Sequence, residues 1–133
     1  MDESTCLTAL VVDDAPFMRS MIIELLTANG INVVGEADNG AVALELYKSL
    51  SPGLVVMDVD MPEVNGLEAF KNIKAFDNGA KIIFCTRFRD SSFIYEIKRL
   101  GAAGYISKPF KPETFMAEIK RGAVKFKTSS NSG

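Results

Sequence analysis

The chain is 133 residues long, 47% of them hydrophobic, with a formal net charge of −2 and no histidine. This length predicts one domain with an ordinary core, and the missing histidine excludes a Ser/His/Asp triad, a Cys/His pair and any histidine-ligated metal site. No apolar run approaches the roughly 18 residues of a membrane span, and the amino-terminal MDESTC lacks the features of a signal peptide, so a cytoplasmic location is expected.

Short apolar runs alternate with longer amphipathic ones along the sequence. The short runs predict five strands, at residues 7–12, 32–37, 54–57, 81–85 and 104–107. The longer segments carry apolar residues at helical spacing and predict five helices, at residues 16–29, 40–50, 67–76, 90–100 and 112–125. Pro16 and Pro112 suit a first helical turn, and Gly30 and Gly101 suit the position just past a helix end. This strict alternation predicts an α/β fold with a parallel sheet covered by helices on both faces.

The sequence suggests one folded unit and no disulfide framework. Residues 1–125 are expected to form the domain, and residues 126–133, which include the polar TSSNSG, a flexible tail or the start of a truncated linker. The two cysteines, Cys6 and Cys85, are far apart and lie in or beside apolar runs. We therefore expect buried, reduced thiols.

Charge is distributed unevenly along the chain. Residues 1–66 carry 11 acidic side chains against Arg19 and Lys48, and residues 67–133 carry 6 acidic side chains against 13 basic ones. Two explanations stay open: an acidic ion-binding end with a basic partner surface, or ordinary solvated helix faces. No basic stripe interleaved with aromatic residues and no nucleic-acid motif is present, so direct nucleic-acid binding is not expected.

Polar side chains follow four of the five predicted strands. Asp13 and Asp14 come after the first strand, Asp58 after the third, Thr86 after the fourth and Lys108 after the fifth. In an open α/β sheet, ligands bind beyond the carboxyl ends of the strands. If the first and third strands are neighbours, three carboxylates meet, and their repulsion requires a bound cation or a retained proton. Oxygen ligands in an incomplete cage favour Mg²⁺ over Ca²⁺.

Each of these residues also has a purely structural explanation. Asp14, which precedes Ala15-Pro16, is explained equally well as a helix N-cap. A lone lysine is usually a solvated charge, and a lone threonine a turn or capping residue. The joint placement of five such groups at one edge of the sheet favours a site. Pro109, directly after Lys108, is a candidate for a cis peptide bond.

Four motifs together resemble a known family. They are LVVDDAPFMR (10–19), VVMDVDMPEVNGLEAF (55–70), IIFCTR (82–87) and GAAGYISKPF (101–110). The set resembles the receiver domains of two-component response regulators, in particular those of the chemotaxis type, and covers nearly the whole chain. The resemblance implies a flavodoxin-like, doubly wound (βα)5 sheet with strand order 2-1-3-4-5. It also implies a signalling domain that promotes its own phosphorylation and dephosphorylation rather than an enzyme.

The resemblance implies roles for the carboxylates. Asp58 would accept a phosphoryl group from a histidine of a partner kinase. Mg²⁺ would be held directly by Asp14, Asp58 and the backbone carbonyl of Asp60, and by Asp13 largely through water. The histidine that carries the phosphoryl group would belong to the partner kinase, so this chain would need none.

The resemblance also implies how the phosphoryl group is bound and how its binding changes the surface that contacts an output protein. Lys108 would pair with the phosphoryl oxygens, and the Thr86 hydroxyl would bond to one of them. Thr86 would shift toward the phosphoryl group and Tyr105 would turn inward. This remodels an output-protein surface on the helix at 90–100, the strand at 104–107 and the helix at 112–125, with Lys98, Arg99, Tyr105, Ile106, Ser107 and Lys111. The chain would act as a monomer or a phosphorylation-dependent dimer.

The sequence departs from the family pattern near the expected phosphoryl pocket. Arg87 and then Phe88 follow Thr86, where the family usually has a small residue next. Asp60 stands two residues after the acceptor, where many relatives carry an apolar or amide residue. We hypothesise that Asp60 and Arg87 pair across the pocket mouth and alter the access of water, with Phe88 as a further modulator.

Two other functions stay open. Asp58-Val59-Asp60 also looks like the nucleophile and acid/base pair of haloacid-dehalogenase-type phosphohydrolases, although in that family the further acidic pair follows the nucleophile, whereas Asp13 and Asp14 precede it. The chain also has no room for a cap domain. A degenerate receiver that only docks a partner is the other alternative, and Arg87 keeps it open. A stand-alone regulator and a fragment of a longer one are not distinguished.

Overall fold

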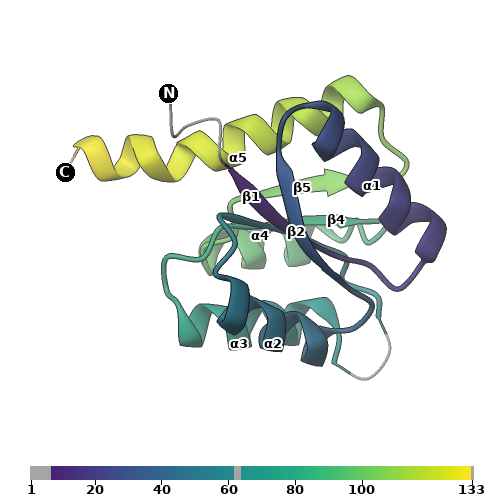
Figure 1. Cartoon of the computed structure of the whole chain (residues 1–133). Coiled ribbons are helices and arrows are strands. Elements are labelled where there is room, and N and C mark those ends of the chain that lie inside the picture. The colour runs from purple at the N-terminus through teal and green to yellow at the C-terminus, as the bar shows by residue number, and fades with distance from the viewer. Residues whose placement is uncertain (1–6, 62–63, 133) are drawn as a thin grey trace.

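In the computed structural model, five strands alternate with five helices along the described part of the chain (Figure 1). The structure describes residues 7–61 and 64–132, and for 124–132 it describes the backbone alone. In chain order the elements are β1 (Thr8–Val12), α1 (Pro16–Ala28), β2 (Asn32–Ala37), α2 (Gly40–Leu50), β3 (Leu54–Met57), α3 (Gly66–Phe76), β4 (Ile82–Thr86), α4 (Ser91–Arg99), β5 (Gly104–Ser107) and α5 (Pro112–Ser132).

The strands form one parallel sheet in the order β2-β1-β3-β4-β5. This confirms the predicted doubly wound fold and its strand order. Strands β1, β3 and β4 are central and buried along nearly their whole length. Their continuous apolar sequences follow from this position, because helices cover both of their faces.

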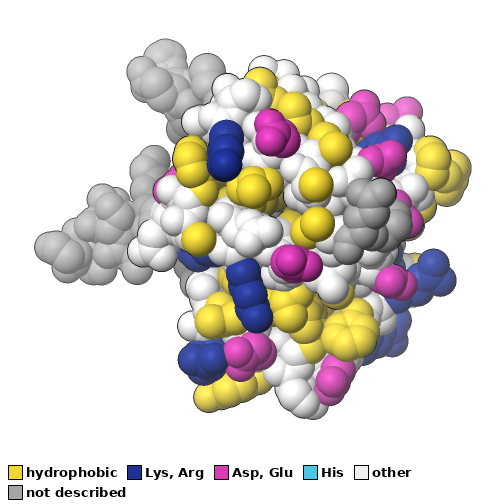
Figure 2. Space-filling view, turned by 90° about the horizontal axis from the view of Figure 1, so that it is seen from below, with side chains coloured by type: hydrophobic (Ala, Val, Ile, Leu, Met, Phe, Trp, Pro, Cys, Tyr) yellow, Lys and Arg dark blue, Asp and Glu magenta, His cyan; other side chains and the backbone are white. Residues whose placement is uncertain are grey.

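Apolar side chains fill two cores, one on each face of the sheet. On one face α1 and α5 pack on the sheet, with Leu26 and Phe115 among their buried side chains (Figure 1). On the other face α2, α3 and α4 contribute Tyr47, Phe70 and Ile97. Figure 2 shows the molecule from below, the side on which α2 and α3 lie, and there Lys and Arg side chains are interspersed with acidic and apolar ones. Such mixing is ordinary for solvated helices.

The helix boundaries agree with the sequence prediction to within one residue, apart from the end of α5. Pro16 and Pro112 begin their helices, while Gly30 and Gly101 follow α1 and α4 with φ of 84° and 101°, a conformation that glycine adopts without strain. No described helix is long and apolar enough to cross a membrane.

The last helix corrects one predicted boundary. It continues to Ser132 instead of ending at residue 125. Residues 123–132 contain neither glycine nor proline, and serine, threonine and asparagine each disfavour a helix by only a fraction of a kcal/mol. The interpretation of 126–133 as a tail or linker stays a prediction, and Gly133 lies outside the described residues. Cys85 is buried and free, as expected, whereas Cys6 lies outside the described residues.

Candidate functional site

Three carboxylates meet at the carboxyl ends of β1 and β3. Val12 pairs with Met57, so that Asp13 and Asp58 leave adjacent strands side by side, and the Asp58 amide donates to the Val12 carbonyl at 3.0 Å. One carboxylate oxygen from each of Asp13, Asp14 and Asp58 lies within 4.8 Å of the other two. Asp13 and Asp58 are only 1% and 7% exposed, while Asp14 is exposed.

Lys108 is the cation that faces this cluster from the end of β5. Its Nζ lies 2.7 Å from Asp13 Oδ2 and 3.2 Å from Asp58 Oδ2. Burial alone lowers the pKa of Lys108, but the hydrogen bond to Asp13 and the charges of Asp58 and Asp13 outweigh it and hold the pKa above its ordinary value. One ammonium group thus faces two buried carboxylates, which leaves a net negative charge, and the Asp14 carboxylate adds to it. The Lys108–Pro109 peptide bond is cis.

The two carboxylates at the end of β1 have different surroundings. Asp13 Oδ1 accepts a hydrogen bond from the Ala15 amide at 2.9 Å, and its Oδ2 faces Lys108. Ala15, not Asp14, occupies the N-cap position of α1, and no side chain caps that helix. The structural explanation of Asp14 as an N-cap is therefore wrong. Its exposed carboxylate is available to a ligand.

The backbone after Asp58 packs closely against the start of α3. Asp58 Oδ1 accepts a hydrogen bond from the Val59 amide at 2.7 Å, and the Gly66 amide donates to the Val59 carbonyl at 2.8 Å. A Cβ atom at Gly66 would collide with the Asp58 carbonyl oxygen, so this close approach requires glycine. Asn65 caps α3 by accepting a hydrogen bond from the Glu68 amide at 2.9 Å.

Thr86 is connected to Tyr105 through one residue of the loop after β4. Thr86 is 1% exposed, and its Oγ1 accepts a hydrogen bond from the Phe88 amide at 3.2 Å. The hydrogen of its own hydroxyl is therefore left to donate elsewhere. The Tyr105 hydroxyl in turn donates to the Phe88 carbonyl at 2.6 Å. The Phe88 ring packs edge-on against Phe93, with 4.9 Å between ring centroids.

The predicted pair between Asp60 and Arg87 is wrong for this structure. Both side chains are exposed, and no ion pair joins them in the described part of the chain. Exposed ion pairs gain little over hydration, so nothing holds these two side chains together. Ile106 also departs from its predicted place on the output surface, because β5 directs it into the core under α1 and α5. The charged residues predicted for that surface, Lys98, Arg99 and Lys111, are exposed.

Sequence reasoning missed two arginines that hold the backbone of the site. Arg19 Nη1 donates to the Asp13 carbonyl at 2.7 Å, and Arg89 Nη2 donates to the Lys108 carbonyl at 2.9 Å. Both ends of the Lys108–Asp13 ion pair are thus tied to an arginine. Arg19 belongs to a recognised motif, but neither periodicity nor spacing indicates which backbone oxygen a long side chain will reach.

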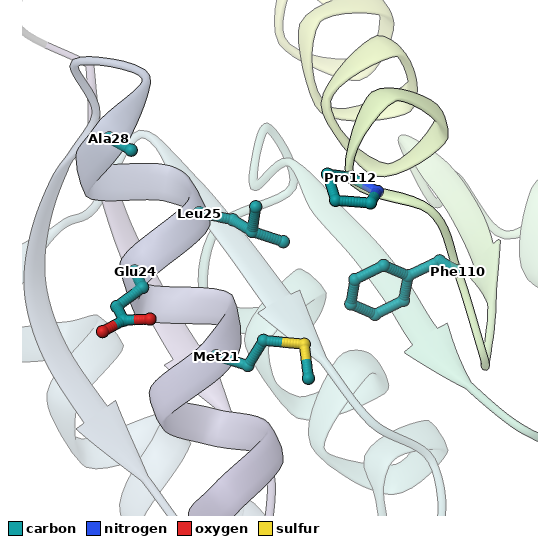
Figure 3. Close-up of a pocket in the computed structure, with 6 residues that line it drawn as sticks. All are labelled: Met21, Glu24, Leu25, Ala28, Phe110 and Pro112. Carbon is teal, nitrogen blue, oxygen red and sulfur yellow. The ribbon is translucent and has the colours of Figure 1, made fainter.

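A hollow of about 410 Å³ lies between α1 and the start of α5, and none of the residues that line it belongs to the carboxylate cluster (Figure 3). Its lining is apolar except for Glu24, whose carboxylate points away from Phe110 in Figure 3. It offers no cation to an anionic group. The carboxylate cluster with Lys108, by contrast, offers both charged oxygen ligands and a cation.

Comparisons with known proteins identify the family of the chain. A sequence profile of the family described as response regulator receiver domain matches residues 9–120. The chain is 46% identical over 112 residues to the chemotaxis protein CheY of Bacillus subtilis, which covers 84% of this chain and 93% of that protein. For CheY of Thermotoga maritima the identity is 43% with the same coverage. The crystal structure of the CheX-CheY-BeF3-Mg+2 complex from Borrelia burgdorferi matches with a TM-score of 0.83 and 25% identity, over 85% of this chain and 86% of that one.

Proposed function

The chain belongs to the response regulator receiver domains of two-component signalling, and from this premise we propose that Asp58 is its phosphoacceptor. The observation that carries the proposal is the meeting of Asp58 with the Lys108 ammonium and the Asp14 carboxylate at one end of the sheet. Asp58 is 7% exposed and at the surface end of a rigid central strand, which suits a nucleophile that an incoming group must reach.

The transfer follows from the groups around Asp58. One carboxylate oxygen of Asp58 attacks the phosphorus of a phosphohistidine on a partner kinase, forming an O–P bond. The P–N bond breaks, and the imidazole leaves with the electron pair. Lys108 then pairs with phosphoryl oxygens, and the Thr86 hydroxyl donates its free hydrogen to one of them. The resulting acyl phosphate is open to hydrolysis, so the signal is reversible.

The donor set at the site fits Mg²⁺. It consists of oxygen atoms alone, and its three carboxylates lie within reach of one ion. Asp14 and Asp58 would hold the ion directly together with the Asp60 carbonyl, and Asp13, the most buried of the three carboxylates, would act through water. Bound there, the ion supplies neutralisation of charge on the phosphoryl oxygens. A relative was crystallised with BeF3 and Mg²⁺, which supports this assignment.

We also propose two partner proteins for this chain. A histidine kinase is the donor, and an output protein contacts the exposed basic residues Lys98, Arg99 and Lys111 beside Tyr105. The chain is a signalling domain of the receiver family rather than a conventional enzyme, and a phosphohydrolase is not favoured. We also propose that the chain promotes its own phosphorylation and dephosphorylation. The cytoplasmic location and the oligomeric state stay predictions.

Intact-mass analysis after incubation with acetyl phosphate and Mg²⁺ tests the assignment. We expect one phosphoryl adduct on the unsubstituted chain and none on Asp58→Ala or after chelation of the metal. Asp60→Ala is the matched control, because it removes the neighbouring carboxylate and keeps Asp58, and it should still form the adduct. An adduct on Asp58→Ala would overturn the assignment of the acceptor. No adduct on any chain, with no beryllofluoride binding, would favour the docking module.

A further inference from the structure

We propose that Arg19 is a positioning residue that fixes the Asp13–Asp14 segment for cation binding. The inference rests on the proposed function, since it concerns the same site. Arg19 and Lys48 are the only cations among residues 1–66, and Arg19 is the one directed at the acidic site.

The side chain of Arg19 connects α1 with β2 and with the segment after β1. From α1, its Nη1 donates to the Asp13 carbonyl at 2.7 Å, and its Nε donates to Glu36 Oε1 of β2 at 2.7 Å. Figure 1 shows α1 lying beside β1 and β2 on one face of the sheet. The Arg19 side chain is only 19% exposed, although Glu36 is 56% exposed. A planar guanidinium with two short bonds is held in one orientation.

These contacts complete the set of bonds around Asp13. Its amide donates to the Ala37 carbonyl at 3.0 Å, its two carboxylate oxygens accept hydrogen bonds from Ala15 and Lys108, and its carbonyl accepts the bond from Arg19. All four polar groups of Asp13 are therefore engaged, and Asp14 extends from this fixed point with its own carboxylate exposed. No side chain caps α1, and the Arg19 side chain is a contact by which this helix reaches back to the segment before it.

Loss of the Arg19 charge and loss of its positioning contacts should change the affinity for Mg²⁺ in opposite directions. This makes the inference testable. A guanidinium near three carboxylates repels a divalent cation, so loss of its charge alone would tighten Mg²⁺ binding. Loss of a group that orients the ligand segment would weaken it, by about tenfold in comparable outer-shell contacts. The sign of the change in affinity therefore separates a positioning role from a purely electrostatic one.

The experiment is a calorimetric Mg²⁺ titration of the full chain and its variants. We expect Arg19→Gln to weaken Mg²⁺ binding about tenfold and Arg19→Lys, which keeps the charge and one donor, to restore part of the affinity. Arg121→Gln is the matched control. Arg121 also pairs with a glutamate, Glu118, at 2.6 Å and reaches a backbone carbonyl, that of Ala103 at 3.5 Å, but at the opposite end of the sheet, and its loss should leave the affinity unchanged.

Hydrogen exchange of the metal-free chain gives a second readout. The amides of Asp13 and Ala15, which donate to the Ala37 carbonyl and to Asp13 Oδ1, should exchange faster in Arg19→Gln than in the unsubstituted chain, while those of the control should not. If Arg19→Gln does not fold, Arg19→Lys carries the test: it keeps the charge but, with a single nitrogen, cannot reproduce both bonds of the guanidinium, so Mg²⁺ binding weaker than that of the unsubstituted chain would follow from position and not from charge. Unchanged or tighter binding in the folded variants overturns this inference alone. Absence of Mg²⁺ binding by the unsubstituted chain overturns the proposed function with it.

Discussion

The Tyr105 hydroxyl donates a hydrogen bond to the Phe88 carbonyl over 2.6 Å. Since the Phe88 amide donates to Thr86 Oγ1, a movement of the Thr86 hydroxyl toward a phosphoryl group has to pull on the same residue that holds Tyr105. The loop after β4 thereby connects the interior of the site to a half-buried tyrosine on β5. The link is short and consists of two hydrogen bonds.

Tyr105→Phe tests this link. The substitution keeps the ring and removes the hydrogen bond to the Phe88 carbonyl, so we expect the free energy of unfolding to fall by about 0.5–1 kcal/mol. The amides of residues 87–90 should also exchange faster with solvent, as measured by hydrogen exchange. Tyr95→Phe is the control, because Tyr95 is 68% exposed on α4. Equal exchange in both variants would show that the hydroxyl does not restrain the loop.

Lys108→Met should reveal the charge imbalance of the site. Removal of the ammonium leaves Asp13 and Asp58 buried without their cation, and breaking such a pair destabilises proteins by about 3 kcal/mol or more. We expect a large loss of stability in urea unfolding without metal, and a smaller loss with Mg²⁺ present, because the added ion replaces the missing positive charge. A loss of the same size with and without Mg²⁺ would argue against a cation site among these carboxylates.

Asp14→Asn and Asp60→Asn should separate a side-chain ligand from a backbone one. Asp14 contributes an exposed carboxylate, so its neutralisation should weaken Mg²⁺ binding by more than about tenfold. The Asp60 substitution keeps the backbone carbonyl and should change the affinity far less. Mg²⁺ titration measures both variants. A larger effect at Asp60 than at Asp14 would reverse the proposed ligand assignment.

Glu118 should make stability depend on pH. Partial burial raises the pKa of Glu118, but hydrogen bonds from Arg121 and the Tyr105 amide, with the charges of Arg121 and Lys98, outweigh it and lower the pKa below its usual value. Because the unfolded pKa is about 4.3, the carboxylate stabilises the fold above that pH, and the contribution disappears as pH falls through the lower folded pKa.

The measurement compares Glu118→Gln with the unsubstituted chain in urea unfolding from pH 7 to pH 3. The difference in unfolding free energy should be about 1 kcal/mol at pH 7 and should shrink toward zero at the acidic end. Glu45→Gln, on an exposed position of α2, is the control and should show no such change. A difference that stays constant over the range would exclude the ionised carboxylate as its source.

The sequence predicted the elements and the principal site because both depend on local patterns. Continuous apolar runs identified the central strands, and the positions of Asp58 after β3, Thr86 at the end of β4 and Lys108 after β5 could be read from the sequence. The contact from Arg19 to the Asp13 carbonyl was not predictable in this way, since any long side chain in that helix has several oxygens within reach. The expected Asp60–Arg87 pair failed for a related reason: residues at one edge of a sheet need not touch when water solvates both.

The separation of Lys108 from its two carboxylate partners along the chain has a further consequence for this site. Lys108 is 95 residues from Asp13 and 50 from Asp58, and β5, which positions it, is the last strand of the sheet. During synthesis the two carboxylates emerge well before their counter-charge, so a chain interrupted before β5 would hold unbalanced negative charge where the strands meet. Under the proposed function, the site that receives the phosphoryl group is therefore complete only when β5, the last strand, is in place.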